Sequence, residues 1–294
     1  MSRRCVPSRR ASTRASRASA PARTRSTSGV RSARARPRRS PACPTMRSRR
    51  SPTNCRSRSM TLDEVLNSLF PHGHAIARDR GLLTGHASLG GTRVDVIGVA
   101  ERLPFGIDEA LALSARVLDT VERGDATPIL VLVDSDSQRM SKRDELLGLN
   151  EALAHLAKCL MVADQAGHRT IGVLYGHTAA GAFIATALAT RTLLALPGAE
   201  PEVMDLPSMS RVTKLPIDVL KEMARSTAVF APGLDNLVKM GAVDAVLDPA
   251  RALDAQLAEW LGKPADRVDR RAARGRPVAA DVAARVEALA RAAR

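Results

Sequence analysis

From residue 60 onward, buried apolar runs alternate with stretches of helical spacing. Residues 129–133 and 171–175 are continuous and rich in β-branched side chains, which is typical of parallel strands buried on both faces. Apolar residues at helical spacing occupy 106–123 and 144–166 between and around these runs. The alternation predicts an α/β fold built from repeated β-α units.

Weaker patterns extend this prediction toward both ends of the chain. Thr61 and Glu64 have the spacing of a capping box and predict the start of a short amphipathic helix. Residues 82–99 are strand-rich, with Gly90-Gly91 as a turn between two strands. Further expected elements are helices at 217–223 and 234–240, a short strand within 241–248 and a solvated helix at 279–294.

Residues 1–59 differ in composition from everything that follows. They contain 18 of the 45 basic residues and no Asp, Glu, Leu, Ile, Phe, Tyr or Trp. Such a segment cannot offset the entropy cost of ordering, so we predict a disordered Arg/Ser-rich extension followed by one domain at 60–294. The formal net charge of +15 therefore resides in the extension, because 27 basic and 30 acidic residues remain in the domain.

The extension has four possible interpretations. The composition of the extension, rich in Arg, Ser, Ala, Pro and Thr and without Leu or Lys, is what GC-rich DNA yields when it is read out of frame. This favours a true start at Met60. An organellar transit peptide, a nucleic-acid-binding arm and a plain linker are the alternatives. A secretory signal is excluded because the segment contains no apolar stretch. With a start at Met60 we expect no nucleic acid among the partners.

The domain gives no sign of a disulfide framework or a membrane anchor. Cys5, Cys43 and Cys55 lie in the extension, which leaves Cys159 as a packing thiol on a helical stripe. Residues 170–190 are uncharged over a membrane-spanning length, but glycines interrupt them and only their second half is helix-like. We therefore expect a cytoplasmic protein without membrane contact.

Common catalytic motifs are missing from the sequence. Gly176 and Gly181 have the glycine spacing of a phosphate-binding loop, but Ala182-Phe183 replaces the required Lys-Ser/Thr pair. The turn contains no serine for a nucleophile elbow, and no His-Glu-x-x-His or paired Asp motif predicts a metal. Hydrolase, phosphate-loop and metal-dependent chemistry are therefore not expected.

A strand-turn-helix at 171–190 remains as the candidate site. Its small residues at 178–181 leave the backbone N–H groups at a helix N-terminus open, so that they can bind an oxyanion. The alternative is that small residues are present only because the strand and the helix pack tightly there. In the loop 135–141 after the preceding strand, Ser137, Gln138 and Arg139 form a second wall that can meet a carboxylate, unless they only cap the strand. His177 is placed to orient a carbonyl or donate a proton.

An ordered set of segments resembles the γ subunit of biotin-independent malonate decarboxylase. The segments are Leu132–Gln138, Arg143–Gly148, Gly176–Phe183, Ala195–Ala199, Val203-Met204 and Ser210–Lys214. The similarity spans about residues 82–250, and it extends more distantly to the carboxyltransferases of biotin-dependent enzymes. It implies a ClpP/crotonase-like fold. Related carboxyltransferases tend to have Pro-Gly where this chain has Asp136-Ser137, so the resemblance does not fix the shape of the loop there.

The resemblance also implies an activity, a carbon–carbon lyase reaction. Together with a β subunit, the chain would decarboxylate a malonyl thioester on an acyl carrier subunit to the acetyl thioester and CO₂, through an enolate held by backbone N–H groups. No cofactor would bind the chain directly, because the CoA-derived prosthetic group belongs to the carrier. The alternatives are a carboxyltransferase subunit of a biotin-dependent acyl-CoA carboxylase and a non-catalytic scaffold for β.

These considerations give eight candidate site residues. The expected catalytic residues are Ala180 and Gly181, with Ser137 and Gln138 opposite them, and the expected substrate-binding residues are Gly176, His177, Thr178 and Arg139.

Overall fold

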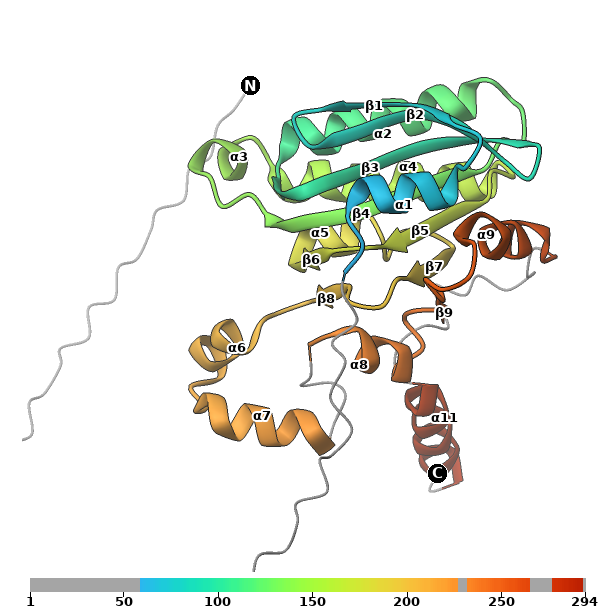
Figure 1. Cartoon of the computed structure of the whole chain (residues 1–294). Coiled ribbons are helices and arrows are strands. Elements are labelled where there is room, and N and C mark those ends of the chain that lie inside the picture. Colours follow the sequence, from blue (N-terminus) through green and yellow to red (C-terminus); the bar gives the residue numbers. More distant parts are fainter. Residues whose placement is uncertain (1–58, 227–231, 265–276, 293–294) are drawn as a thin grey trace, which may run out of the picture. The chain divides into compact units, whose positions relative to one another are not determined.

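The computed structural model describes residues 59–226, 232–264 and 277–292, which are drawn in colour in Figure 1. Internal contacts divide the chain into Met1–Thr53 and Asn54–Arg294, and all described residues belong to the second unit. Of the extension predicted at 1–59 only Ser59 is described, so the predicted disorder lies outside the described residues.

Helices and strands alternate through most of the described chain (Figure 1). The helices are α1 (Leu62–Leu69), α2 (Ile107–Glu122), α3 (Lys142–Leu146), α4 (Leu149–Gln165), α5 (Ala180–Ala185), α6 (Leu206–Thr213), α7 (Ile217–Ser226), α8 (Leu234–Lys239), α9 (Leu253–Gly262) and α11 (Pro277–Ala292). The strands are β1 (His74–Asp79), β2 (Leu82–Leu89), β3 (Thr92–Phe105), β4 (Ile129–Gln138), β5 (Thr170–Leu174), β6 (His177–Ala179), β7 (Thr192–Ala195), β8 (Glu200–Glu202) and β9 (Ala245–Val246).

The strands form a large sheet and a small one. The large sheet has the order β1-β2-β3-β4-β5-β7-β9, and it is parallel from β3 onward, with β1 and β2 added antiparallel. In the small sheet β6 pairs with β8 in parallel. The predicted α/β architecture is confirmed, and it brings the carboxyl ends of β4 and β5 to one edge.

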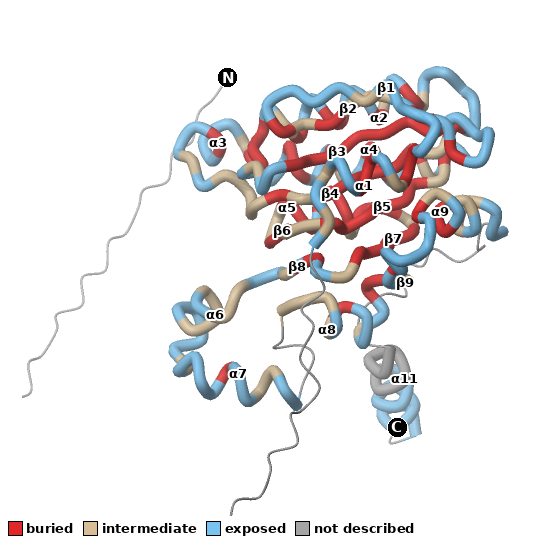
Figure 2. The backbone as a smooth tube through the Cα atoms, in the orientation of Figure 1, coloured by how far each residue is buried: buried red, intermediate tan, exposed pale blue. Residues whose placement is uncertain are grey.

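Alternation along the strands builds two cores, one on each face of the sheet. In β4, Ile129, Val131 and Val133 belong to the cluster beneath α2, α4 and α5, and Leu130 and Leu132 to the cluster beneath α1 and α9. Figure 1 shows these helices on opposite faces of the sheet, and Figure 2 shows the central strands buried. This explains why β4 is a continuous apolar run rather than an alternating one.

Several local predictions are confirmed. Thr61 and Glu64 form the capping box of α1, and Gly90-Gly91 make the turn between β2 and β3. The uncharged stretch 170–190 is divided among β5, β6 and α5. In the part of the chain that the structure describes, no helix is long and apolar enough to cross a membrane.

Two predictions were wrong. The single helix at 144–166 is two helices, α3 and α4, because Gly148 between them adopts a left-handed conformation with φ 84°. Residues 135–138 are not a loop, since β4 continues through Gln138. It does so because β3 also extends to Phe105 and supplies a parallel partner for the polar residues.

Candidate functional site

The two predicted walls of the site, the polar end of β4 and strand β6, lie side by side. Side-chain hydrogen bonds connect them. Asp134 Oδ1 accepts the His177 backbone N–H at 3.0 Å, and the hydroxyls of Ser135 and Thr178 are 2.8 Å apart. Ser135 and Thr178 are both fully buried, so Thr178 is a structural connection between the two walls in this structure.

The predicted oxyanion donor at Gly181 is occupied by a side chain of the same chain. Its N–H donates to Gln138 Oε1 over 2.8 Å, so Gln138 lies on the donor instead of facing it across an open gap. A Cβ on Gly181 would lie 3.1 Å from that oxygen, and glycine therefore permits the close approach. The bond shows that the turn presents a backbone donor to a carbonyl-type oxygen.

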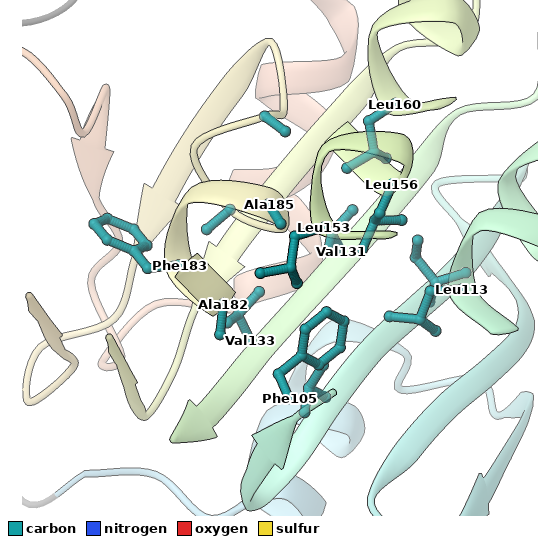
Figure 3. Packing of buried hydrophobic residues seen from close by; sticks show 14 of the residues in the cluster. Phe105, Leu113, Val131, Val133, Leu153, Leu156, Leu160, Ala182, Phe183 and Ala185 are labelled. Carbon is teal, nitrogen blue, oxygen red and sulfur yellow. The ribbon is translucent and has the colours of Figure 1, made fainter. Parts of the chain in front are cut away.

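Ala180 turns the chain sharply into α5. Its φ of 48° lies in the left-handed region, which costs an L-residue on the order of 1 kcal/mol. α5 is only six residues long, so the helix-dipole contribution expected at 171–190 is small. In its place packing fixes the turn, because Ala182 lies beside Val133 in the core beneath α2, α4 and α5 (Figure 3), and Phe183 is buried in the same cluster.

At the other end of β6, Gly176 and His177 line a cavity of about 460 Å³. Its walls come from β1, β3 and β4, from the residues that follow β5, from the start of β8, and from the residues before and at the start of α1. They include Arg78, Glu101, Arg102, Asp134, Tyr175 and Glu200. Glycine is required at position 176, because a Cβ there would lie 2.2 Å from Asp134 Oδ1. The cavity therefore opens where ligands commonly bind in open α/β sheets.

A bulge in β3 shapes one wall of this cavity. Glu101 and Arg102 have φ values of 63° and 51°, and the register with β4 shifts between Val99 and Leu103. Bulges re-aim side chains next to functional sites, and two consecutive left-handed residues are a strained way to do so. The sequence carries no glycine or other turn signal at this position, so the bulge was not predicted.

His177 is held in a mostly buried, charged environment. Its Nδ1 lies 3.1 Å from the Ser135 carbonyl oxygen, and its Nε2 is 3.5 Å from Glu202 Oε1. Burial lowers the pKa of His177, and the charge of Arg102 lowers it further. Burial raises the pKa of the Glu202 carboxyl, with repulsion from Asp205 and Glu200 adding to it. Glu202 lies on the short strand β8, which was not predicted.

The remaining predicted residues have local partners. The Arg139 guanidinium forms an ion pair with Glu109 and lies 3.6 Å from the buried carboxylate of Asp144, so its charge is neutralised within the chain. The Ser137 hydroxyl donates to the Gln138 carbonyl oxygen at 3.3 Å. The structure thus separates the predicted residues into a cavity end with His177 and a turn end with Gly181.

Two other features concern metals and thiols. Among residues 59–226, 232–264 and 277–292, no group of three or more His, Cys, Asp or Glu side chains is arranged to hold a metal ion. Cys159 is buried in the core as predicted, and burial raises the pKa of its thiol.

Comparisons with known proteins agree with this fold. The structure superposes on the Pseudomonas malonate decarboxylase MdcD-MdcE hetero-dimer with a TM-score of 0.62 and 26% identity, over 79% of this chain and 98% of that chain. A Pseudomonas malonate decarboxylase hetero-tetramer in complex with coenzyme A gives a TM-score of 0.64 at 24% identity, with the same coverage. Transcarboxylase 12S shares the fold at a TM-score of 0.58 and 18% identity, over 73% and 45% of the two chains.

Sequence comparisons identify the family. The malonyl-S-ACP:biotin-protein carboxyltransferase MADD of Malonomonas rubra is 28% identical over 169 residues, which are 52% of this chain and 58% of that protein. The chain therefore spans less than two thirds of the length of this curated relative. The family model for the malonate decarboxylase gamma subunit, MdcE, matches residues 100–290. On this match the chain belongs to the malonate decarboxylase gamma subunit family, with the crotonase-like carboxyltransferase fold.

Proposed function

We propose that the chain acts with a β-type subunit to decarboxylate a malonyl thioester carried on an acyl carrier subunit. The carbon–carbon bond to the carboxylate breaks, CO₂ leaves, and the electron pair forms an enolate that is then protonated to the acetyl thioester. The carrier's prosthetic arm arrives as part of the substrate. The chain's own task in this reaction is to hold the thioester oxygen while negative charge develops on it.

The hydrogen bond from Gly181 to Gln138 is the observation that carries this proposal. A backbone N–H at the turn holds a side-chain amide oxygen, which has the shape and polarity of a thioester oxygen. For the substrate to bind there, the Gln138 side chain must rotate away and release the donor. Family membership supports the assignment, because the matched residues 100–290 include both β4 and the turn.

A biotin-dependent carboxyl transfer is the second candidate. It is favoured by the relative from Malonomonas rubra, whose name describes transfer from malonyl-S-ACP to a biotin protein. Both reactions pass through the same enolate and differ in whether CO₂ or a biotin acceptor takes the carboxyl group. Avidin distinguishes them, because it sequesters biotin without affecting free CO₂ release.

CO₂ release from a malonyl thioester of the carrier tests the proposal. The full chain is assayed alone and together with a β-type partner, with and without avidin. Avidin-resistant release that requires both chains is the expected result. Release only with a biotin acceptor would favour the transferase, and a folded complex without either activity would contradict both.

Variants of Gln138 test whether this chain supplies an oxyanion donor. Gln138→Glu places a carboxylate on the Gly181 N–H and should lower turnover by about 10²-fold, the usual cost of losing one such donor. Gln138→Ala frees the donor and should preserve or raise turnover. Gln165→Ala, at an exposed glutamine at the end of α4, is the matched control. Unchanged turnover in both Gln138 variants would indicate a scaffold whose partner supplies the donors.

A further inference from the structure

His177 and Glu202 face each other at the edge of the cavity. β6 and β8 pair so that Ala179 is opposite Glu202, which places the Glu202 side chain diagonally beside His177. Nε2 and Oε1 are 3.5 Å apart, and the two side chains are 11% and 22% exposed. A histidine and a carboxyl group are thus held together, largely out of water, with the histidine lining the cavity.

The Ser135 carbonyl determines which ring nitrogen carries the proton. A carbonyl oxygen can only accept, so the 3.1 Å contact requires a proton on Nδ1 of His177. In the neutral ring Nε2 then has a free lone pair directed toward Glu202. One additional proton can therefore be shared between Nε2 and the Glu202 carboxyl.

Burial brings the proton affinities of the two groups closer together. Burial disfavours both the imidazolium and the carboxylate, so it lowers one pKa and raises the other. The charged groups facing the pair are Arg102 from β3, Asp134 and Asp136 from β4, Glu200 from β8 and Asp205 at the start of α6. Two ionisable groups in contact titrate as a coupled pair.

We propose that His177 and Glu202 are a proton-sharing pair that delivers the proton converting the enolate to the acetyl thioester. The shared proton moves from Nε2 of His177 to the α-carbon of the enolate, which leaves a neutral imidazole beside the Glu202 carboxylate, and a proton from solvent restores the pair. His177 is then a catalytic residue and Glu202 a positioning residue. This inference rests on the proposed function, since it needs an enolate whose oxygen is held by the Gly181 N–H while its α-carbon meets Nε2 of His177.

The existence of the pair is tested without substrate or partner. The ring of His177 is titrated by NMR in the full chain, alongside Glu202→Gln and, as a control, Glu222→Gln on the exposed face of α7. Loss of the neighbouring carboxylate should move the His177 midpoint to lower pH, and Glu222→Gln should leave it in place. An identical midpoint in Glu202→Gln and the wild type would overturn the pair.

Proton delivery is tested in the complex with the β-type subunit. An enolate that is not protonated recaptures CO₂, so labelled CO₂ returning to the malonyl thioester is compared with acetyl thioester formed. His177→Gln should raise this ratio by about 10²-fold, as expected for loss of a general acid. Glu202→Gln should raise the ratio less. The pH below which acetyl thioester formation becomes faster should also be lower in this variant than in the wild type. A purely structural role would lower both fluxes and leave the ratio unchanged, which would overturn the inference.

Failure of the proposed function gives a different result. If the wild-type complex releases no CO₂, proton delivery is overturned together with decarboxylation. The NMR titration still shows whether His177 and Glu202 share a proton, so loss of the reaction is distinguished from loss of the pair.

Discussion

The two ends of β6 differ in chemistry although only three residues lie between His177 and Gly181. The His177 end is charged: an imidazole and several carboxyl groups surround a cavity of about 460 Å³. The Gly181 end is neutral, and a backbone N–H there meets an amide oxygen. Between them Thr178 is buried against Ser135. Residues that are close in the sequence therefore present different groups, a titratable side chain at His177 and a backbone donor at Gly181.

The comparison suggests a division of tasks along β6. Groups that gain and lose protons gather at the cavity, whereas the turn offers a donor whose charge does not change with pH. Each end also depends on a different backbone feature, a glycine packed against Asp134 at one end and a left-handed alanine at the other. Substitutions at these positions should affect the two ends separately.

The largest expected effect is at the cavity end, for Gly176→Ala. A Cβ would lie 2.2 Å from Asp134 Oδ1, so the carboxylate must move and give up the His177 N–H that it accepts. We expect a loss of about 2–3 kcal/mol in the free energy of unfolding, measured by urea denaturation.

Two further variants show whether this loss comes from the clash. Gly262→Ala, where an added Cβ meets nothing within 4 Å, should change stability by less than about 0.5 kcal/mol. In a double-mutant cycle, Asp134→Ala should remove much of the cost of Gly176→Ala. Additive losses would show that the contact with Asp134 is not the cause.

At the turn end, Gln138→Ala should cost less, about 1 kcal/mol, because it leaves the Gly181 N–H without its side-chain acceptor. The Gly181 amide should also exchange its hydrogen faster in the variant. Gln165→Ala should change neither quantity. Unaltered exchange at Gly181 would mean that the hydrogen bond to Gln138 does not protect this amide.

The large sheet was predictable because its signals are local. The runs at 129–133 and 171–175 are buried on both faces, and this makes them continuous in the sequence. β8 has only three residues, with Pro201 in the middle, and nothing in its composition indicates a strand. Glu202 was missed for this reason.

The candidate site was predictable to a smaller extent. The small residues at 178–181 correctly marked the entry to α5, but residues 177–179 form strand β6 and not the predicted turn. The Gln138–Gly181 bond and the partners of Arg139 depend on tertiary packing, which spacing does not reveal. The left-handed conformation of Ala180 has no signal either, because glycine is the residue that normally marks it.

Ala180→Gly should have a smaller effect, of opposite sign. Glycine adopts a φ of 48° without steric cost, so the variant should gain about 0.5–1 kcal/mol in thermal or urea unfolding. Ala182→Gly, two residues later in a buried helical position, should instead lose about 1 kcal/mol or more. If both variants are destabilised, the left-handed alanine is not strained.

The smallest effects separate His177 from Glu202 by the sign of their pH dependence. The pKa of His177 is lowered from its ordinary 6.5. On acidification the unfolded chain therefore binds the proton at a higher pH than the folded chain does, and stability falls as the pH drops below 6.5. The pKa of Glu202 is raised from its ordinary 4.5, so its contribution is fully present below 4.5 and is lost as pH rises through the folded-state value. The stability gained by His177→Gln over the wild type should therefore grow on acidification, whereas that gained by Glu202→Gln should shrink. Urea unfolding measured between about pH 7.5 and pH 4.5 gives the pH dependence of each variant's stability difference from the wild type. If both differences change with pH in the same direction, the two pKa shifts do not have opposite signs.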